Sequence, residues 1–414
     1  MHILAMRTIL LYMLISLPMW VSGQAIRCDV DRRFDLSGDQ KAYQQFLTRI
    51  HRAQSQQAIH SRSVIFLPVV IHVVAREPFM PITEAQVLNQ LDVLNADFAG
   101  LGENIPSLGD EFTSLVTDAQ IRFCLATVDP QGQPTSGITF TSTEIKDIAL
   151  QTEQGGRIAI HYDQLGKSGW DPARYINIWV GEYGDILGSA SFPGMAPFPE
   201  EIGLVLDIRH FGSIGDAGGA GFYNRGHTLT HEMGHFFGLK HIWGQGFDTT
   251  CEDSDDIDDT PNAEGPYFDC PSGVQMSCGT SNMYQNFMDF TDDRCLAAFT
   301  AGQVAVMQAA QSVYYPGLPL EGGCIMHAAT YDQWYDNLVW SYDSQSQACV
   351  IYNVDGWPYV KKISVYSADG KLVHEGYWEG EWSYLLDLSN SAPGVYFVKL
   401  DSGGKDYVRK IAVY

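Results

Sequence analysis

The sequence predicts an α+β protein that ends in a small antiparallel β-sandwich. The β-branched run "VIFLPVVIHVV" (64–74) is typical of a buried strand. The segment "ITEAQVLNQLDVLNADFAG" (82–100) repeats apolar residues at helical spacing, and Thr83 can cap its start. After about Gly322 the chain changes to short alternating segments separated by Asp-Gly, Asn-Ser and Gly-Gly turns, which indicates the sandwich.

Length and composition limit the class of protein. With 414 residues the chain can form two or three domains, and 45% apolar against 18% charged residues indicates a globular protein. The formal net charge of −24 argues against nucleic acid as a partner, because phosphate binding needs a basic surface. An acidic surface suits calcium or basic substrates instead.

The first 23 residues have the pattern of a secretory signal peptide. Arg7 precedes the apolar run Ile9–Val21, which ends at the small residues Ser22 and Gly23. This run is short for a membrane span. The alternatives are a membrane anchor or a lipoprotein leader, and no cysteine directly follows the run to carry a lipid. Export makes the eight cysteines candidates for disulfides.

The remaining elements follow in order. Residues 24–62 form a polar segment, interpreted as a pro-segment, and the domain that follows spans 63–322. Its further strands are predicted at "IRFCLAT" (121–127), "RYINIWVGE" (174–182) and "GLVLDIRHF" (203–211). Strands and long helices in this mixture fit an α+β or α/β half-domain. A Pro/Gly-rich join at Pro316–Gly323 leads into a linker and the sandwich, residues 323–414.

The segment "HEMGHFFGLKH" (231–241) carries the clearest chemical signal. His231 and His235 are four residues apart, so on a helix both project from one face and can bind one zinc ion. Gly238 lets the chain turn, so that His241 can return as a third ligand. Glu232 can reach a metal-bound water as general base. Three protein ligands leave one position open, which is the catalytic arrangement.

This motif resembles that of the metzincin metallopeptidases, which also have a methionine-containing turn downstream; Met288 in "NFMDF" fits it. Residues 63–310 are most similar to the pappalysin family, in its ulilysin-like bacterial branch. The resemblance implies a mixed twisted sheet with an active-site helix and a zinc endopeptidase activity. It also rests on the cysteines near the site and on the segments "GSASFPG" (188–194), "DDIDDTPN" (255–262) and "NFMDFTDDRC" (286–295).

The block "CEDSDDIDDTP" holds six carboxylates between Glu252 and Asp259, which repel one another unless they are solvated or neutralised. Calcium takes clustered oxygen ligands of this kind. A solvated acidic loop is the alternative. The family resemblance implies calcium here, with Asp255, Asp258 and Thr260 as candidate ligands.

Four cysteines, Cys251, Cys270, Cys278 and Cys295, fall within 45 residues and allow three pairings, among which their spacing does not choose. The resemblance implies Cys251–Cys278 and Cys270–Cys295. Two further expectations concern the other cysteines. Cys324 is expected to pair with Cys349 across the linker, and Cys124 is expected to be a buried, free thiol.

Substrate preference and catalysis follow from the same resemblance. Asp293 matches the position at which ulilysin-like enzymes place an aspartate in the S1′ pocket, which implies cleavage before Arg or Lys. A calcium ligand or a surface acid is the alternative. The strand at 203–211 is the expected upper rim for an extended substrate. Phe290 replaces the tyrosine usual after the Met-turn, so its missing hydroxyl predicts a slower enzyme.

Cys28 stands alone in the polar segment before the catalytic domain. A thiolate there could occupy the open zinc position and keep the enzyme latent, and a structural cysteine is the alternative. Cleavage of the Ser61–Arg62 bond by the protein itself would fit a preference for Arg after the scissile bond. A Glu232→Ala protein would then keep its pro-segment.

Residues 350–414 resemble the sorting domains of the bacterial type IX secretion route through "VYSADGKLV", "LDLSNSAPGVYFVKL" and the final Lys410-Ile411. This implies a secreted, extracellular or cell-surface protein that passes through the periplasm and contacts the secretion machinery. An adhesive or carbohydrate-binding sandwich is the alternative for this domain. For the whole chain, the competing hypothesis is a catalytically impaired binding protein.

Overall fold

The computed structural model describes most of the catalytic portion and much of the C-terminal sandwich. The signal peptide, the Ser61–Arg62 bond and Cys324 lie outside the described residues. The described ranges are 26–29, 40–56, 64–76, 82–153, 155–215, 221–244, 250–319, 338–343, 348–353, 362–367, 370–378, 383–392, 394–401 and 406–413.

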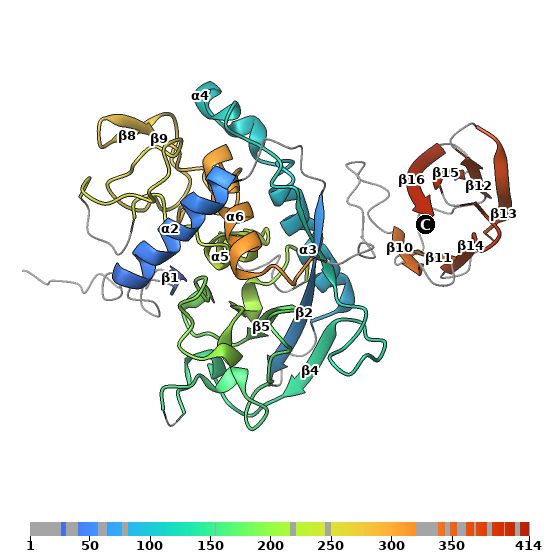
Figure 1. Cartoon of the computed structure of the whole chain (residues 1–414), viewed down its shortest axis with the longest axis horizontal. Helices are drawn as coiled ribbons and strands as arrows, with labels where there is room; N and C mark the ends of the chain where they lie inside the picture. Colours follow the sequence, from blue (N-terminus) through green and yellow to red (C-terminus); the bar gives the residue numbers. More distant parts are fainter. Residues whose placement is uncertain are drawn as a thin grey trace, which may run out of the picture.

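A seven-stranded mixed sheet is the framework of the larger part (Figure 1). Its order is β1-β6-β7-β5-β2-β3, with β4 also paired to β2. Strand β6 runs antiparallel to β7, and the other pairings are parallel, so the expected mixed sheet is confirmed. The strands are β1 (Ile26–Cys28), β2 (Ile65–Ala75), β3 (Ile121–Leu125), β4 (Ile138–Ser142), β5 (Ile176–Gly181), β6 (Ile186–Ala190) and β7 (Leu204–Asp207).

Strand β2 is central and almost entirely buried, as its run of β-branched residues predicts. One polar side chain, His72, lies in this apolar strand. Its Nδ1 is 2.8 Å from the Thr139 hydroxyl and its Nε2 is 3.1 Å from Asn177 Oδ1. Burial lowers the pKa of His72 to about 4. The imidazole therefore stays neutral in the folded protein at neutral pH.

This buried histidine predicts acid sensitivity. The unfolded chain takes up a proton at His72 near pH 6.5, whereas the folded chain does so only near pH 4. Its contribution to stability is therefore present above pH 6.5 and is lost as the pH falls toward 4. We expect His72→Gln to reduce the loss of unfolding free energy between pH 6.5 and 4.5 by on the order of 1–2 kcal/mol. Urea unfolding at several pH values checks this, and an unchanged pH slope would contradict it.

Helices cover the sheet and hold the centre of the domain. Helix α3 (Glu84–Phe98) begins at Thr83, whose hydroxyl accepts from Gln86 N, so the predicted cap is confirmed. Helix α6 (Ala301–Tyr314) has a capping box formed by Thr300 and Gln303. The other α-helices are α2 (Gln40–Gln56), α4 (Asp110–Thr113) and α5 (His227–Phe236), and the 3₁₀ helices are Ile105–Ser107, Ile148–Leu150, Ala159–His161, Pro199–Glu201 and Ile208–His210.

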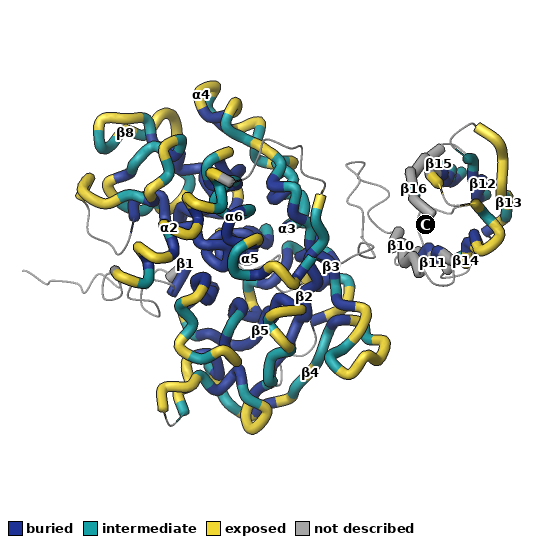
Figure 2. Tube along the Cα trace, in the orientation of Figure 1, coloured by how far each residue is buried: buried dark blue, intermediate teal, exposed yellow. Residues whose placement is uncertain are grey.

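Helix α5 is buried along its whole length in the middle of the domain (Figure 2). A polar contact ties it to α3: Asp97 accepts hydrogen bonds at Oδ2 from His227 Nδ1, at 2.8 Å, and from Thr230 Oγ1, at 2.6 Å. None of the helices in the described ranges is long and apolar enough to cross a membrane.

The C-terminal part forms the expected antiparallel sandwich and has a hydrophobic core of its own. A three-stranded sheet has the order β10-β11-β14, and a four-stranded sheet has the order β13-β12-β15-β16. Cys349 is buried in this core. The strands are β10 (Leu338–Asp343), β11 (Ala348–Asn353), β12 (Lys362–Ser367), β13 (Leu372–Tyr377), β14 (Ser383–Asp387), β15 (Gly394–Asp401) and β16 (Asp406–Val413).

Two expectations from the sequence are wrong. The segment 203–211 was expected at the upper rim of the cleft, but its strand β7 lies inside the sheet between β5 and β6. Strand β6 is the one that offers its outer side, and β1 pairs with it there. Cys124 is disulfide-bonded and not a free thiol. Its position in a buried apolar strand is typical of a free cysteine but also accommodates a disulfide.

Candidate active site

The histidine helix α5 begins and ends at glycines with positive φ angles. Gly226 precedes it with a φ of +83°, and Gly238 follows with a φ of +89°. A side chain at Gly238 would also collide with the ring of Phe46 from α2. The left-handed turn at Gly238 leads the chain back to His241, as the motif predicts.

The three histidines meet at one point. His235 Nε2 lies 3.1 Å from His231 Nε2 and 3.1 Å from His241 Nε2, and all three rings are buried. His231 Nδ1 donates to Phe287 O at 2.6 Å, and His235 Nδ1 donates to Leu239 O at 2.7 Å. Burial, followed by the neighbouring histidines, lowers the pKa of His231 well below its usual range.

These bonds fix the tautomers of His231 and His235. A proton held on Nδ1 by a carbonyl leaves the Nε2 lone pair of a neutral imidazole directed at the shared point. Two imidazoles oriented by carbonyls, with the His241 ring converging on the same point, fit a zinc ion. Cys28 Sγ belongs to the same cluster, whose four ligand atoms all lie within 4.8 Å of one another.

Glu232 is fully buried beside this cluster. Its side chain packs against the backbone of Gly188 on β6, where an added Cβ would lie 2.7 Å from Glu232 Cγ. Cys28 Sγ lies 3.6 Å from Glu232 Oε2. The carboxylate therefore contacts both strand β6 and the thiol that belongs to the histidine cluster.

Met288 lies under the histidine helix. A Cβ on Gly234 would lie 2.5 Å from Met288 Sδ, so glycine is needed at that position. The turn is held by Asn286, whose Oδ1 accepts from Met288 N at 2.9 Å and whose Nδ2 donates to Gln303 Oε1 at 2.8 Å. Met288 therefore packs against the helix that carries His231 and His235.

Phe290 follows in the same turn and packs among the ligands. Its ring centroid lies 4.8 Å from that of His241, 5.7 Å from that of His231 and 5.0 Å from that of Trp243. Phenylalanine supplies this packing but has no hydroxyl to donate, unlike the tyrosine that the resemblance led us to expect.

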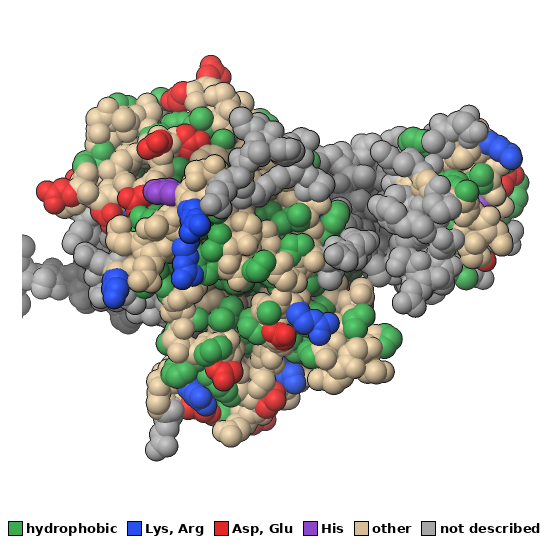
Figure 3. Space-filling model, viewed as in Figure 1, with side chains coloured by type: hydrophobic (Ala, Val, Ile, Leu, Met, Phe, Trp, Pro, Cys, Tyr) green, Lys and Arg blue, Asp and Glu red, His purple; other side chains and the backbone are tan. Residues whose placement is uncertain are grey.

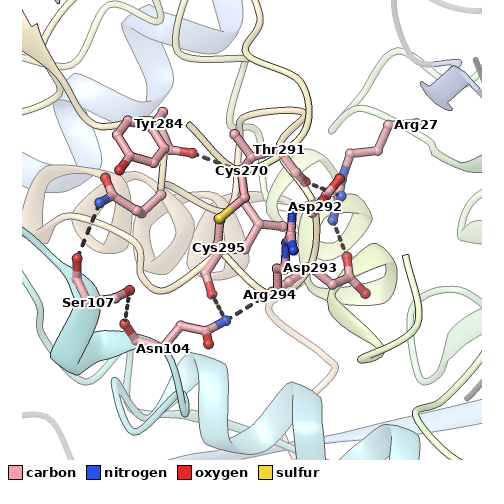
Figure 4. Close-up of a disulfide and its surroundings, with 12 residues drawn as sticks. Arg27, Asn104, Ser107, Cys270, Tyr284, Thr291, Asp292, Asp293, Arg294 and Cys295 are labelled. Atoms are coloured by element: carbon pink, nitrogen blue, oxygen red, sulfur yellow. Dashed lines mark hydrogen bonds and ion pairs between the residues drawn. A yellow bond between two sulfur atoms is a disulfide. The ribbon is translucent and has the colours of Figure 1, made fainter. Parts of the chain in front are cut away.

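Asp293 is fully buried and lies against Arg27 (Figure 4). Its Oδ1 is 3.0 Å from Arg27 Nη2, an ion pair in which neither side chain is exposed. Arg225 N donates to Asp293 Oδ2 at 2.8 Å, and Asp293 N donates to Phe222 O at 3.0 Å. The backbone of 222–225 thus holds the Asp293 carboxylate in place, and the guanidinium of Arg27 neutralises its charge.

The acidic loop divides into a buried part and an exposed part. Burial raises the pKa of Asp255 to about 8, and no donor among the described residues bonds to its buried Oδ2. Thr260 is also buried and lies close enough to Asp255 to influence that pKa. Asp258 is exposed. Asp259, which the sequence did not single out, accepts from Thr300 Oγ1 and Gly302 N at the start of α6.

Acidic side chains gather on the face that carries α4 and the hairpin β8 (Gln275–Ser277) and β9 (Thr280–Asn282) (Figure 3). One disulfide, Cys251–Cys278, joins the acidic loop to this hairpin, with a Cα–Cα distance of 5.4 Å. Another, Cys270–Cys295, joins the following loop to the Met-turn region, with a Cα–Cα distance of 5.8 Å (Figure 4). These are the pairings that the resemblance implied.

Two residues of the site were missed in the sequence. Arg27 had no visible role in a polar segment, and only the Cys beside it drew attention. Its function in the structure depends on β1 pairing with β6, with Ile26 opposite Ile186 and Cys28 opposite Gly188. Tyr223 lies over the Arg27 guanidinium, with Arg27 Cζ 5.0 Å from the ring centroid. Neither the pairing of β1 with β6 nor the contact of Tyr223 with Arg27 can be recognised from a local pattern in the sequence.

Comparisons with known proteins agree with this geometry. Residues 160–312 match the family described as pregnancy-associated plasma protein-A, and residues 346–414 match the secretion system C-terminal sorting domain. An extracellular metalloprotease of Arthroderma benhamiae is 35% identical over 148 residues, which are 35% of this chain and 49% of that protein. The chain therefore spans about half the length of this curated relative.

Two solved structures from Tannerella forsythia are similar over most of their length. A mutant of promirolysin is 32% identical with a TM-score of 0.62, covering 70% of this chain and 96% of that one. Mature mirolysin in complex with a cleaved peptide is 35% identical with a TM-score of 0.56, covering 63% of this chain and 100% of that one. Fold and site together define a metzincin metallopeptidase. The chain belongs to the pappalysin family and carries a type IX sorting domain at its C-terminus.

Proposed function

We propose that the protein is a secreted zinc-dependent endopeptidase. The observation that carries this proposal is the convergence of three buried Nε2 atoms, with Glu232 packed against strand β6 beside them. The mature mirolysin structure, titled as a complex with a cleaved peptide, supports the assignment to peptide hydrolysis. The experiment is cleavage of Arg- and Lys-containing peptides by the mature enzyme, with and without a zinc chelator.

His231, His235 and His241 would hold the zinc ion. Bound zinc would acidify a water molecule and polarise the scissile carbonyl. Glu232 accepts the proton of that water at its carboxylate and returns it to the leaving amine nitrogen. Strand β6 supplies the backbone edge along which an extended substrate lies, since β1 already pairs there. The buried carboxylate of Asp293 favours Arg or Lys at P1′, the position after the scissile bond.

The pro-segment would keep this enzyme latent. Cys28 lies in the histidine cluster and Arg27 pairs with Asp293, so β1 occupies the place proposed for the substrate. Strand β1 runs parallel to β6. Helix α2 strengthens the attachment because Phe46 and Ile50 are buried in a cluster with Phe192 and α6. Release from the cleft requires cleavage downstream of α2, and the proposed Ser61–Arg62 site lies there, outside the described residues.

Removal of the cysteine tests this latency. We expect full-length Cys28→Ser to hydrolyse an Arg-containing peptide at least ten times faster than the full-length wild type, since a hydroxyl is a much weaker zinc ligand than a thiolate. Activity is measured before mass spectrometry detects any loss of the pro-segment, with Cys349→Ser in the C-terminal sandwich as a cysteine-to-serine control far from the histidines in sequence. Equal latency of the Cys28→Ser and wild-type proteins would show that the thiol does not block the site.

Calcium is proposed as a second cofactor, held by Asp255 and Thr260 with Asp258 from the same loop. The buried Asp255 carboxyl, with Oδ2 lacking a donor among the described residues, fits an oxygen site for a cation. Lys240 neutralises another part of the loop, because its Nζ lies 2.9 Å from Asp256 Oδ2.

This site predicts stabilisation by calcium. At a calcium concentration of 100 times Kd, binding adds about 2.7 kcal/mol to the unfolding free energy. The Tm should therefore rise by several degrees in calcium relative to a chelator, and Asp255→Asn should remove most of that rise. Asp185→Asn, in the turn before β6, serves as the control. A calcium response that persists in Asp255→Asn would place the ion elsewhere.

The second candidate is a catalytically impaired binding protein, and Phe290 is the observation that favours it. Phe290 removes a hydroxyl donor beside His241 but leaves the three histidines and Glu232 intact. A binding protein has no need for Glu232, so the endopeptidase remains the favoured function. Chelator-sensitive cleavage decides between the two.

A further inference from the structure

The guanidinium of Arg27 donates hydrogen bonds from two different nitrogens, to two different acceptors. Its Nη1 donates to Thr291 O at 2.8 Å, and its Nη2 donates to Asp293 Oδ1 at 3.0 Å (Figure 4). The Arg27 side chain is fully buried. The two acceptors, a carbonyl and a carboxylate, therefore match the two ends of the guanidinium fork.

The flat face of the same guanidinium lies over Tyr223, with Arg27 Cζ 5.0 Å from the ring centroid. The backbone of the segment that carries this ring is held by hydrogen bonds. Phe222 O accepts from Asp293 N, Arg225 N donates to Asp293 Oδ2, and His210 Nδ1 lies 3.0 Å from Tyr223 O. Tyr223 therefore contacts the guanidinium from a segment whose backbone is bonded to Asp293.

We propose that Tyr223 is a specificity-determining residue which, together with the Thr291 carbonyl, makes the Asp293 site select Arg over Lys at P1′. This inference rests on the proposed function, because it takes Arg27 as a marker for the substrate side chain. The planar, weakly hydrated guanidinium stacks on an aromatic ring more favourably than an ammonium does.

Lysine loses a contact that arginine makes. Its single nitrogen cannot occupy the positions of both Nη1 and Nη2, so an ammonium that pairs with Asp293 leaves the Thr291 carbonyl without its donor. A buried acceptor that is left without a donor weakens the binding of the ligand. A site with two acceptors therefore binds arginine, which has a nitrogen for each, more tightly than lysine, which has one nitrogen.

The test uses the mature enzyme and three peptides that differ only at P1′, which is Arg, Lys or citrulline. Wild type should cleave the Arg peptide with a kcat/KM on the order of ten times that for Lys. Citrulline keeps the shape of arginine without its charge and should be poor. Tyr223→Leu should lower kcat/KM for Arg about 3- to 10-fold and for Lys less, whereas Tyr223→Phe should keep the wild-type ratio.

The outcomes separate this inference from the proposed function. Equal rates on the Arg and Lys peptides by wild type would overturn the selection of Arg over Lys, and this result needs no variant to fold. A Tyr223→Leu enzyme with an unchanged Arg-to-Lys ratio would overturn the role of Tyr223. No cleavage of any of the three peptides, or cleavage unaffected by chelation, would instead contradict the endopeptidase proposal itself.

Discussion

Replacement of Glu232 by alanine is expected to lower kcat for peptide hydrolysis by about 10²–10⁴-fold, the range that general acid–base catalysis supplies. Glu232 is the buried carboxylate beside the histidine cluster, and it packs on the Gly188 backbone. The proton of the attacking water then has no acceptor at that position. Steady-state kinetics on an Arg-containing peptide, with the pro-segment removed from both proteins by another protease and zinc content measured in parallel, checks this prediction.

Two controls make the Glu232 result specific. Glu232→Gln keeps the size of the side chain and should be nearly as inactive, which separates proton transfer from packing. The alanine protein should keep its three histidine ligands and therefore its zinc. It should also keep its pro-segment when no other protease is present. Full activity of either variant would remove Glu232 from the mechanism.

Replacement of Asp293 by asparagine is expected to have the next largest effect. Breaking a buried, hydrogen-bonded charge pair costs about 2–5 kcal/mol, so kcat/KM for peptides with Arg or Lys at P1′ should fall on the order of 10²–10³-fold. Asparagine keeps an acceptor for Arg225 N and therefore the shape of the site. Kinetics on peptides with Arg or Leu at P1′ measure the change.

The Leu peptide and a neighbouring variant serve as controls for Asp293. Asp293→Asn should not lower the rate on the Leu peptide, since an apolar side chain makes no ion pair. Asp269→Asn removes an exposed carboxylate from the same region and should leave the preference intact. If Asp293→Asn lowered the rates on both peptides equally, Asp293 would be a structural residue and not a determinant of specificity.

The features that the sequence predicted are those with a local pattern. The spacing from His231 to His241 specifies a helix face, a turn and a returning ligand, and the structure brings the three rings together. In the same way, the helical spacing of the apolar residues in 82–100 and the hydroxyl of Thr83 specify a helix with an N-terminal cap. These signals need no knowledge of distant residues, because helix geometry alone relates their members.

The features that the sequence did not predict depend on long-range pairing. The segment 203–211 alternates like an exposed edge strand but lies inside the sheet, whereas the strand to which β1 adds, 186–190, contains Gly188, Ser189 and Ala190, which are weak strand formers. Gly188 is needed there because Glu232 packs against its backbone. Arg27 gains its role only when β1 reaches Thr291 and Asp293, more than 260 residues away.

Zinc-dependent cleavage of one peptide by the mature enzyme tests the central claim most directly. A peptide with a single Arg is incubated with the enzyme, then with the enzyme after chelation, and then after zinc is restored. The geometry of His231, His235 and His241 predicts cleavage before Arg, loss of activity on chelation and recovery with about one zinc per chain. Cleavage that persists after complete removal of zinc, or a zinc-loaded mature enzyme that cleaves no peptide, would contradict the account.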